Sequence, residues 1–234
     1  MIKYKPVSAA NMNALALEEQ ERGKAERRRE HLSRLTGAHT TMPIEDRSMV
    51  NRWLRIAKDH DANRVRGGVS WYLLLVLGFG TGLRIGDLCR LRVKDVRCRE
   101  RVCIIAEKTD KQTDIPLQAA TRKAIDGLLK NMDENDYALT SRQKSRKTGE
   151  SKPISRQRCY DIMRKIAKEA GFDEHVGCHT MRKTFAWHLY QSTGGNLALL
   201  QKVLNHSSQE ATIHYLGLDQ KAIDEAITKM PTFI

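Results

Sequence analysis

The sequence predicts a mainly α-helical fold with a small antiparallel β-sheet. Apolar residues recur at helical spacing through most of the chain after Ser48. A short β-branched segment at 101–106 is followed, across a polar tip, by a second short segment at 114–117, which is the pattern of a hairpin. With 40% apolar residues among 234, the chain can bury one good core and a small second unit.

We expect residues 1–42 to form a charged, helical N-terminal arm, and residues 43–234 to form the compact domain. The arm contains EEQERGKAERRRE, which has good helix formers and almost no apolar face. It is therefore either a solvated helix or an arm that contacts a partner or a neighbouring subunit. Pro43, Glu45 and Asp46 have the composition of a helix start.

The pattern from Ser48 predicts a first amphipathic helix, and the apolar run at 69–79 predicts a central buried helix. Gly78, Gly80 and Gly82 are expected to break that helix and to allow a tight turn before a helix at 85–91. Arg84 would then lie at a helix start, where backbone amides and its guanidinium can face one anion.

Helical patterns return four times after the hairpin and once more near the C-terminus. The last of these places one apolar face on a helix at 219–230. The expected helices are 119–131, 155–170, 179–192, 197–204 and 219–230, the last with Ala222, Ile223, Ala226, Ile227 and Met230 on its apolar face.

The net charge of +13 favours a polyanionic partner such as nucleic acid, although ribosome and membrane-surface association share this signature. The longest apolar run, at 71–80, is too short to span a bilayer, and no secretion signal precedes the domain. Five cysteines without CxxC spacing indicate reduced thiols. We therefore expect a cytoplasmic, nucleoid-associated protein that has no membrane partner.

Residues 141–158 carry seven basic residues and one acidic residue, or +6 of the net charge. Gly149 and Pro153 favour a flexible loop followed by a basic helix, which would neutralise phosphates without reading bases. An ordinary solvated basic loop is the alternative. The candidate DNA-binding residues are Arg142, Lys144, Arg146, Lys147, Lys152, Arg156 and Arg158.

Four further motifs contain an anion-binding set with one nucleophile: TGLRIGDL, the hairpin lysine ahead of IPL, HTMRKTFA and LNHSSQEATIHY. His179 and Arg182 are three residues apart, so a helix places them on one face. Arg84 could hold the same phosphate bidentately from the other side. Tyr215 is the nucleophile, and since a tyrosine has a pKa of about 10, nearby cations or a base must activate it.

In this order and spacing, the motifs resemble the tyrosine recombinase (phage integrase) family over roughly residues 44–230. The resemblance implies the catalytic-domain fold of that family. It also implies that Tyr215 attacks a DNA phosphate to give a 3′-phosphotyrosyl link, with His179 as general base and His206 bonded to the phosphate. Lys108 would be the general acid, with Lys111 as its competitor.

The implied catalytic set is Arg84, Lys108, His179, Arg182, His206 and Tyr215, with Asp87 expected to orient Arg84. The chemistry needs no cofactor. His175, Cys178 and His179 invite a zinc site, but no second ligand pair has suitable spacing, so no metal is predicted.

Two residues depart from the family pattern: Asn205 stands where a glycine usually precedes the second histidine, and Lys183 stands where a histidine often follows the second arginine. Family members also commonly carry a separate N-terminal clamp domain, for which 42 residues leave little room. We therefore expect a site-specific recombinase that acts on double-stranded DNA as a homotetramer, linked through the C-terminal helix, with an accessory DNA-binding protein as a further partner. A type IB topoisomerase and a non-cleaving DNA-binding accessory protein are the alternatives.

Overall fold

The computed structural model describes residues 41–63, 68–144, 151–172, 174–216, 227–228 and 230–231. The predicted arm at 1–42 lies outside this range except for its last two residues, and so does most of the predicted helix at 219–230. The described part is mainly helical with a small amount of antiparallel β-sheet, as predicted, but it contains two hairpins where one was expected. Its helices are α2 (Arg47–Ala62), α3 (Trp71–Thr81), α4 (Ile85–Arg90), α5 (Val93–Val96), α6 (Ala119–Leu129), α7 (Arg156–Ala170), α8 (Thr180–Ser192), α9 (Leu197–Leu204) and α10 (Gln209–Leu216).

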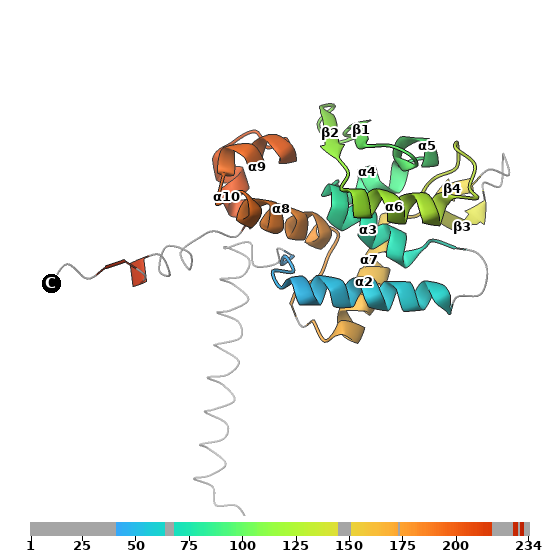
Figure 1. Cartoon of the computed structure of the whole chain (residues 1–234), viewed down its shortest axis with the longest axis horizontal. Coiled ribbons are helices and arrows are strands. Elements are labelled where there is room, and N and C mark those ends of the chain that lie inside the picture. The colour runs from blue at the N-terminus through green and yellow to red at the C-terminus, as the bar shows by residue number, and fades with distance from the viewer. Residues whose placement is uncertain are drawn as a thin grey trace, which may run out of the picture. The chain divides into compact units, whose positions relative to one another are not determined.

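The apolar helix α3 is the centre of the core. It contacts α2, α6 and α8 (Figure 1), and every residue from Leu73 to Gly78 is buried. Its N-cap Ser70 accepts a hydrogen bond from the backbone N–H of Leu73, and Asp46 caps α2 in the same way. None of the helices in the described ranges is long and apolar enough to cross a bilayer.

The prediction that three glycines break this helix is wrong for two of them. Gly78 and Gly80 lie inside α3, and only Gly82 ends it, as a C-cap with a left-handed φ of 61°. A Cβ at Gly78 would lie 2.2 Å from the sulfur of Met181 on α8. This glycine therefore allows close approach of two helices rather than a turn.

The predicted hairpin is present, but its first strand is one residue shorter than expected and its second strand begins two residues earlier. β1 (Arg101–Ile105) pairs with β2 (Gln112–Pro116) in an antiparallel register that places Arg101 opposite Pro116 and Ile105 opposite Gln112. Lys108 lies in the connecting turn.

A second hairpin stands where the sequence predicted only a flexible basic loop. β3 (Thr140–Lys144) pairs with β4 (Ser151–Pro153), and the chain between them, 145–150, lies outside the described residues. The short helices α5 and α10 were not predicted either. The described residues of the basic segment 141–158 therefore lie in β3, in β4 and in the first turn of α7.

A small apolar cluster is separate from the main core. Its buried members come from the last three described helices, which gather at one end of the helical body in Figure 1. They are Ala186 on α8, Leu200 and Leu204 on α9, and Leu216 on α10. Tyr215 packs against this cluster, so the candidate nucleophile lies where α8, α9 and α10 meet.

The close packing at Gly78 predicts that Gly78→Ala destabilises the protein, because the new methyl group overlaps a fully packed methionine. We expect a loss of about 1–3 kcal/mol in the free energy of unfolding, measured by urea denaturation. Gly127→Ala in α6 is the matched control, since nothing lies within 4 Å of its Cβ; it should gain about 0.5–1 kcal/mol. Equal effects of the two substitutions would contradict this packing account.

Candidate active site

Arg182 is the buried centre of the site. Its side chain is on α8 and is 5% exposed. One Nη donates to the backbone oxygen of Gly82 and the other to that of Leu204, each at 2.7 Å. Burial lowers the pKa of Arg182, yet no carboxylate pairs with it in the described part of the chain. A guanidinium has five N–H donors, so these two bonds leave others for an anion.

The hydroxyl of Tyr215, on α10, is buried and makes no hydrogen bond of normal geometry with another described residue, although Arg182 lies near enough to act on it. Burial raises the pKa of Tyr215 to about 12, against the opposing effect of the positive charges of Arg182 and Arg84. The phenol is therefore protonated at neutral pH in the free protein. It lies beside the two cations that would stabilise its anionic form.

His206 follows α9 and stacks edge-on against the nucleophile, with ring centroids 5.1 Å apart. Burial, and then the charges of Arg182 and Arg84, lower the pKa of His206 to about 4. The imidazole is consequently neutral at pH 7. It can donate one hydrogen bond to a phosphate but carries no charge there.

The hydroxyl of Thr212 lies within hydrogen-bond distance of Nδ1 of that neutral ring. Its hydroxyl oxygen lies 3.1 Å from Nδ1 of His206 and 3.2 Å from the backbone oxygen of Ser208. A hydroxyl has only one hydrogen. When Thr212 donates it to Nδ1, the ring proton must be on Nε2, where it can reach a phosphate; when it donates to Ser208, Nδ1 holds the proton instead.

His179 is the N-cap of α8 and is also neutral at pH 7. Burial lowers its pKa first, followed by the charges of Arg182, Lys183, Arg84 and Lys108. The charges of four cations therefore act on this histidine, and a neutral imidazole can accept a proton. This is the state that a general base requires.

Arg84 is the N-cap of α4, as the sequence predicted, and is half-buried. Its guanidinium makes no hydrogen bond or ion pair with any residue that the structure describes. It therefore keeps all its donors for an external anion, unlike Arg182.

The β1–β2 hairpin, whose turn carries Lys108, is held in place at three points. At one, Asn205 Nδ2 donates to the backbone oxygen of Gln112 and to Oγ1 of Thr113, at 3.3 and 3.1 Å. Asn205 has a left-handed φ of 53°, a conformation that asparagine tolerates better than most residues, and so it can replace the usual glycine. The residue that departs from the family pattern thus ties β2 to the turn that carries His206.

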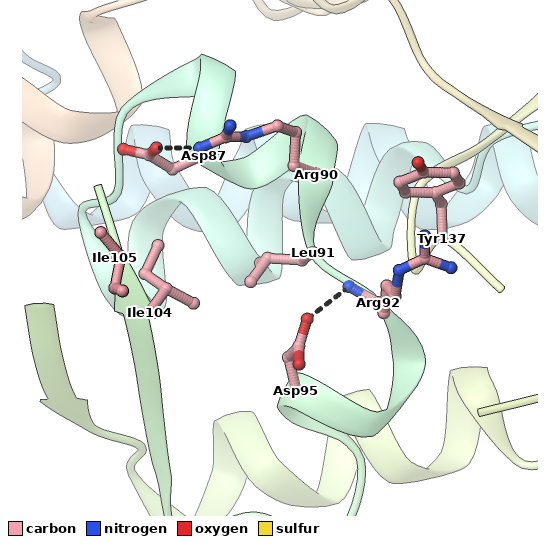
Figure 2. A pocket seen from close by; sticks show the side chains of 8 residues that line it. All are labelled: Asp87, Arg90, Leu91, Arg92, Asp95, Ile104, Ile105 and Tyr137. Carbon is pink, nitrogen blue, oxygen red and sulfur yellow. Dashed lines mark hydrogen bonds and ion pairs between the residues drawn. The ribbon is translucent and has the colours of Figure 1, made fainter. Parts of the chain in front are cut away.

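The second anchor is Asp87, whose partners differ from the predicted one. Its carboxylate accepts from the backbone N–H of Glu107 at 3.0 Å and from Arg90 at 3.4 Å, and no hydrogen bond or ion pair joins it to Arg84 in the described part of the chain. Figure 2 shows Asp87 and Arg90 at the edge of a pocket of about 330 Å³. Asp87 therefore supports the hairpin rather than orienting Arg84.

Glu107 connects the same hairpin to α7 through an ion pair with Arg156 at 2.9 Å. Arg156 is thus engaged within the protein, although it was predicted to contact DNA. Lys152 and Arg158 are exposed, and the side chains of the four remaining basic candidates, Arg142, Lys144, Arg146 and Lys147, lie outside what the structure describes.

Lys183 also lies in the site, although the sequence marked it only as a departure from the family pattern. It is 7% exposed, and its Nζ lies 5.3 Å from the centroid of the Tyr215 ring. Burial lowers its pKa. A lysine in a helix suggests a solvated face, so no pattern in the sequence indicated this position.

Among the described residues, no group of three or more His, Cys, Asp or Glu side chains could hold a metal ion. The five cysteines are free thiols, and the sulfurs of Cys89 and Cys159 lie 3.7 Å apart in the core.

Comparison with known proteins decides the family. The model of the phage integrase family matches residues 43–222. The chain belongs to that family. It is 40% identical to a probable integrase/recombinase, YoeC, of Bacillus subtilis over 64% of this chain and 78% of that protein. It is also 28% identical to the tyrosine recombinase XerA of Pyrococcus horikoshii over 67% of this chain, but spans only 53% of that relative.

Solved phage integrase and recombinase structures have the same fold. A XerA recombinase aligns with a TM-score of 0.61 at 23% identity over 83% of this chain and 66% of that one. The catalytic domain of bacteriophage HP1 integrase aligns with a TM-score of 0.52 at 18% identity over 82% of this chain and 96% of that one. The predicted family and catalytic-domain fold are therefore confirmed, and the family is one of DNA strand-exchange enzymes.

Proposed function

We propose that the protein is a site-specific DNA recombinase that cleaves and rejoins double-stranded DNA through Tyr215. The observation that carries the proposal is the convergence of cations on one buried phenol: Arg182 and Arg84 act on Tyr215, and both, with Lys108, act on His179. The relatives named as tyrosine recombinases, and a lambda integrase solved as a dimer bound to a core site, support DNA as the substrate.

The proposed reaction is a transesterification at a DNA phosphate. The Tyr215 oxygen attacks phosphorus and passes its proton to His179, while the bond from phosphorus to the 5′-oxygen breaks and Lys108 supplies the proton to that oxygen. Attack by a 5′-hydroxyl on the 3′-phosphotyrosyl link reverses each step. Because bond energy is conserved, neither ATP nor a cofactor is needed.

The arginines have different tasks in this reaction. Arg84 makes no side-chain hydrogen bond or ion pair with the described residues, so its guanidinium can hold two non-bridging oxygens. Arg182 is fixed by two carbonyls, so its remaining donors are held in one orientation at the phosphate. Fixed donors that face developing charge are the most effective form of electrostatic stabilisation.

Binding and assembly follow from the rest of the chain. We propose that residues 43–234 form the catalytic domain and that the arm at 1–42 lies outside it. Lys152 and Arg158, which are exposed, would neutralise DNA phosphates together with the other basic residues of 141–158. The apolar face of 219–230 would join protomers in a tetramer on DNA, and an accessory protein would complete the clamp.

The proposal predicts a covalent protein–DNA adduct on a nicked suicide duplex that carries the recombination site. Tyr215→Phe keeps the ring and its packing but lacks the attacking oxygen, so the adduct should disappear while DNA binding persists. Denaturing electrophoresis detects the adduct, and a mobility-shift assay provides the binding control. Absence of an adduct on every site-containing DNA would sink the enzyme proposal, whereas adducts and relaxation on arbitrary plasmid DNA would favour a topoisomerase.

Replacing the 5′-bridging oxygen with sulfur distinguishes Lys108 from Lys111 as general acid. A thiolate leaves without protonation, so the defect of Lys108→Ala should be at least tenfold smaller on the sulfur substrate than on ordinary DNA. Lys111→Ala is the matched control on the same hairpin and should cleave both substrates at nearly the wild-type rate in single-turnover assays. Recovery of Lys111→Ala by sulfur, and not of Lys108→Ala, would exchange the two assignments.

A further inference from the structure

Lys183 is a buried cation that the proposed chemistry has not yet used. It follows Arg182 on α8, and 7% of its surface is exposed. Its ammonium makes no hydrogen bond or ion pair with any residue in the described part of the chain. It lies over the face of the Tyr215 ring, 5.3 Å from the centroid, and its charge also acts on His179. A buried charge without a counter-ion destabilises the folded protein, so a functional reason for this lysine is needed.

Packing alone does not explain a lysine at this position. The aliphatic part of a lysine can cover apolar surface, but its charged end then normally reaches water. Here most of the side chain is covered and burial lowers the pKa of the amine. A methionine would fill a similar volume without the cost of burying a charge.

Each other charged or titratable group around Tyr215 has a different task. Arg182 is held by two carbonyls, Arg84 makes no side-chain hydrogen bond or ion pair with the described residues, and His206 is neutral. Lys183 contacts the ring itself. A cation above an aromatic face attracts a neutral phenol weakly, and it attracts a phenolate more strongly because the ring then carries a full negative charge.

We propose that Lys183 is a positioning residue for the nucleophile, whose ammonium holds the Tyr215 ring and stabilises the phenolate as its proton leaves. The inference rests on the proposed cleavage by Tyr215 and adds a cation outside the predicted catalytic set. It also gives a reason for a lysine where the family often has a histidine.

The first test needs no DNA. We would place 3,5-difluorotyrosine, whose phenol titrates nearer neutral pH, at position 215 and follow its ionisation by fluorine NMR in the full chain. Lys183→Met removes the charge at similar volume, and Lys183→Arg keeps it. The pKa of the fluorinated phenol should rise by about one unit in Lys183→Met and stay near the wild-type value in Lys183→Arg. Equal pKa values in all three proteins would overturn the proposal.

The second test uses single-turnover cleavage of suicide DNA across a pH series. Lys183→Met should cleave about tenfold more slowly at neutral pH, and the pH at which its cleavage rate increases should be higher than in wild type. Lys183→Arg should recover most of the rate. Because the effect is on the nucleophile, the 5′-sulfur substrate should not rescue Lys183→Met. Rescue by sulfur, or an unchanged pH profile, would contradict the proposal.

The two tests separate this inference from the proposed function. If wild-type protein forms no adduct while the pKa of the phenol still depends on Lys183, cleavage by Tyr215 is wrong and the electrostatic contact stands. If wild-type protein forms the adduct and the pKa does not depend on Lys183, only the role of Lys183 is wrong.

Discussion

A buried guanidinium held by two backbone carbonyls is the interaction on which the rest of the site depends. Arg182 joins the end of α3 to the end of α9, and so links the main core to the small cluster that supports Tyr215. Carbonyl groups are neutral, so they fix the direction of the guanidinium without cancelling its charge. A carboxylate partner would hold the side chain equally well but would remove the positive charge that acts on Tyr215 and His206.

The consequence is an uncompensated positive site in the free protein. Arg84 and Lys183 add charge near Arg182, and both histidines in the set are held neutral by burial and by these cations. The unfavourable repulsion among the cations is relieved when an anion enters. Proteins often accept lower stability where function needs such an arrangement, and a DNA phosphate would neutralise the charge that the fold does not.

Local patterns predicted most of the fold because they act over a few residues. Asp46 caps α2 in the segment predicted to be a helix start, and Arg84 lies at a helix start as predicted. The exceptions depend on contacts between distant segments. Gly78 stays helical because Met181 packs on it, and the polar strand TSRQK lacks the apolar alternation that identifies a strand.

The site shows the same division. The order of the motifs identified the six candidate residues, whereas the contacts that hold and orient them join distant parts of the chain. Asp87 accepts a hydrogen bond from the hairpin instead of orienting Arg84, Asn205 ties that hairpin to the turn before His206, and the hydroxyl of Thr212 lies 3.1 Å from Nδ1 of His206. These contacts join residues that no spacing rule connects, and so the sequence alone could not indicate them.

The different roles of the two arginines give the most direct test of this account. The measurement is the free energy of unfolding of Arg182→Ala and Arg84→Ala, with adduct formation assayed in parallel. Loss of two charged hydrogen bonds should destabilise Arg182→Ala by about 3–5 kcal/mol, whereas Arg84→Ala should be as stable as wild type or slightly more so, and neither should form the adduct at an appreciable rate. Equal losses of stability, or an Arg182→Ala variant as stable as wild type, would contradict the claim that Arg182 stabilises the folded site whereas Arg84 contributes only to phosphate binding.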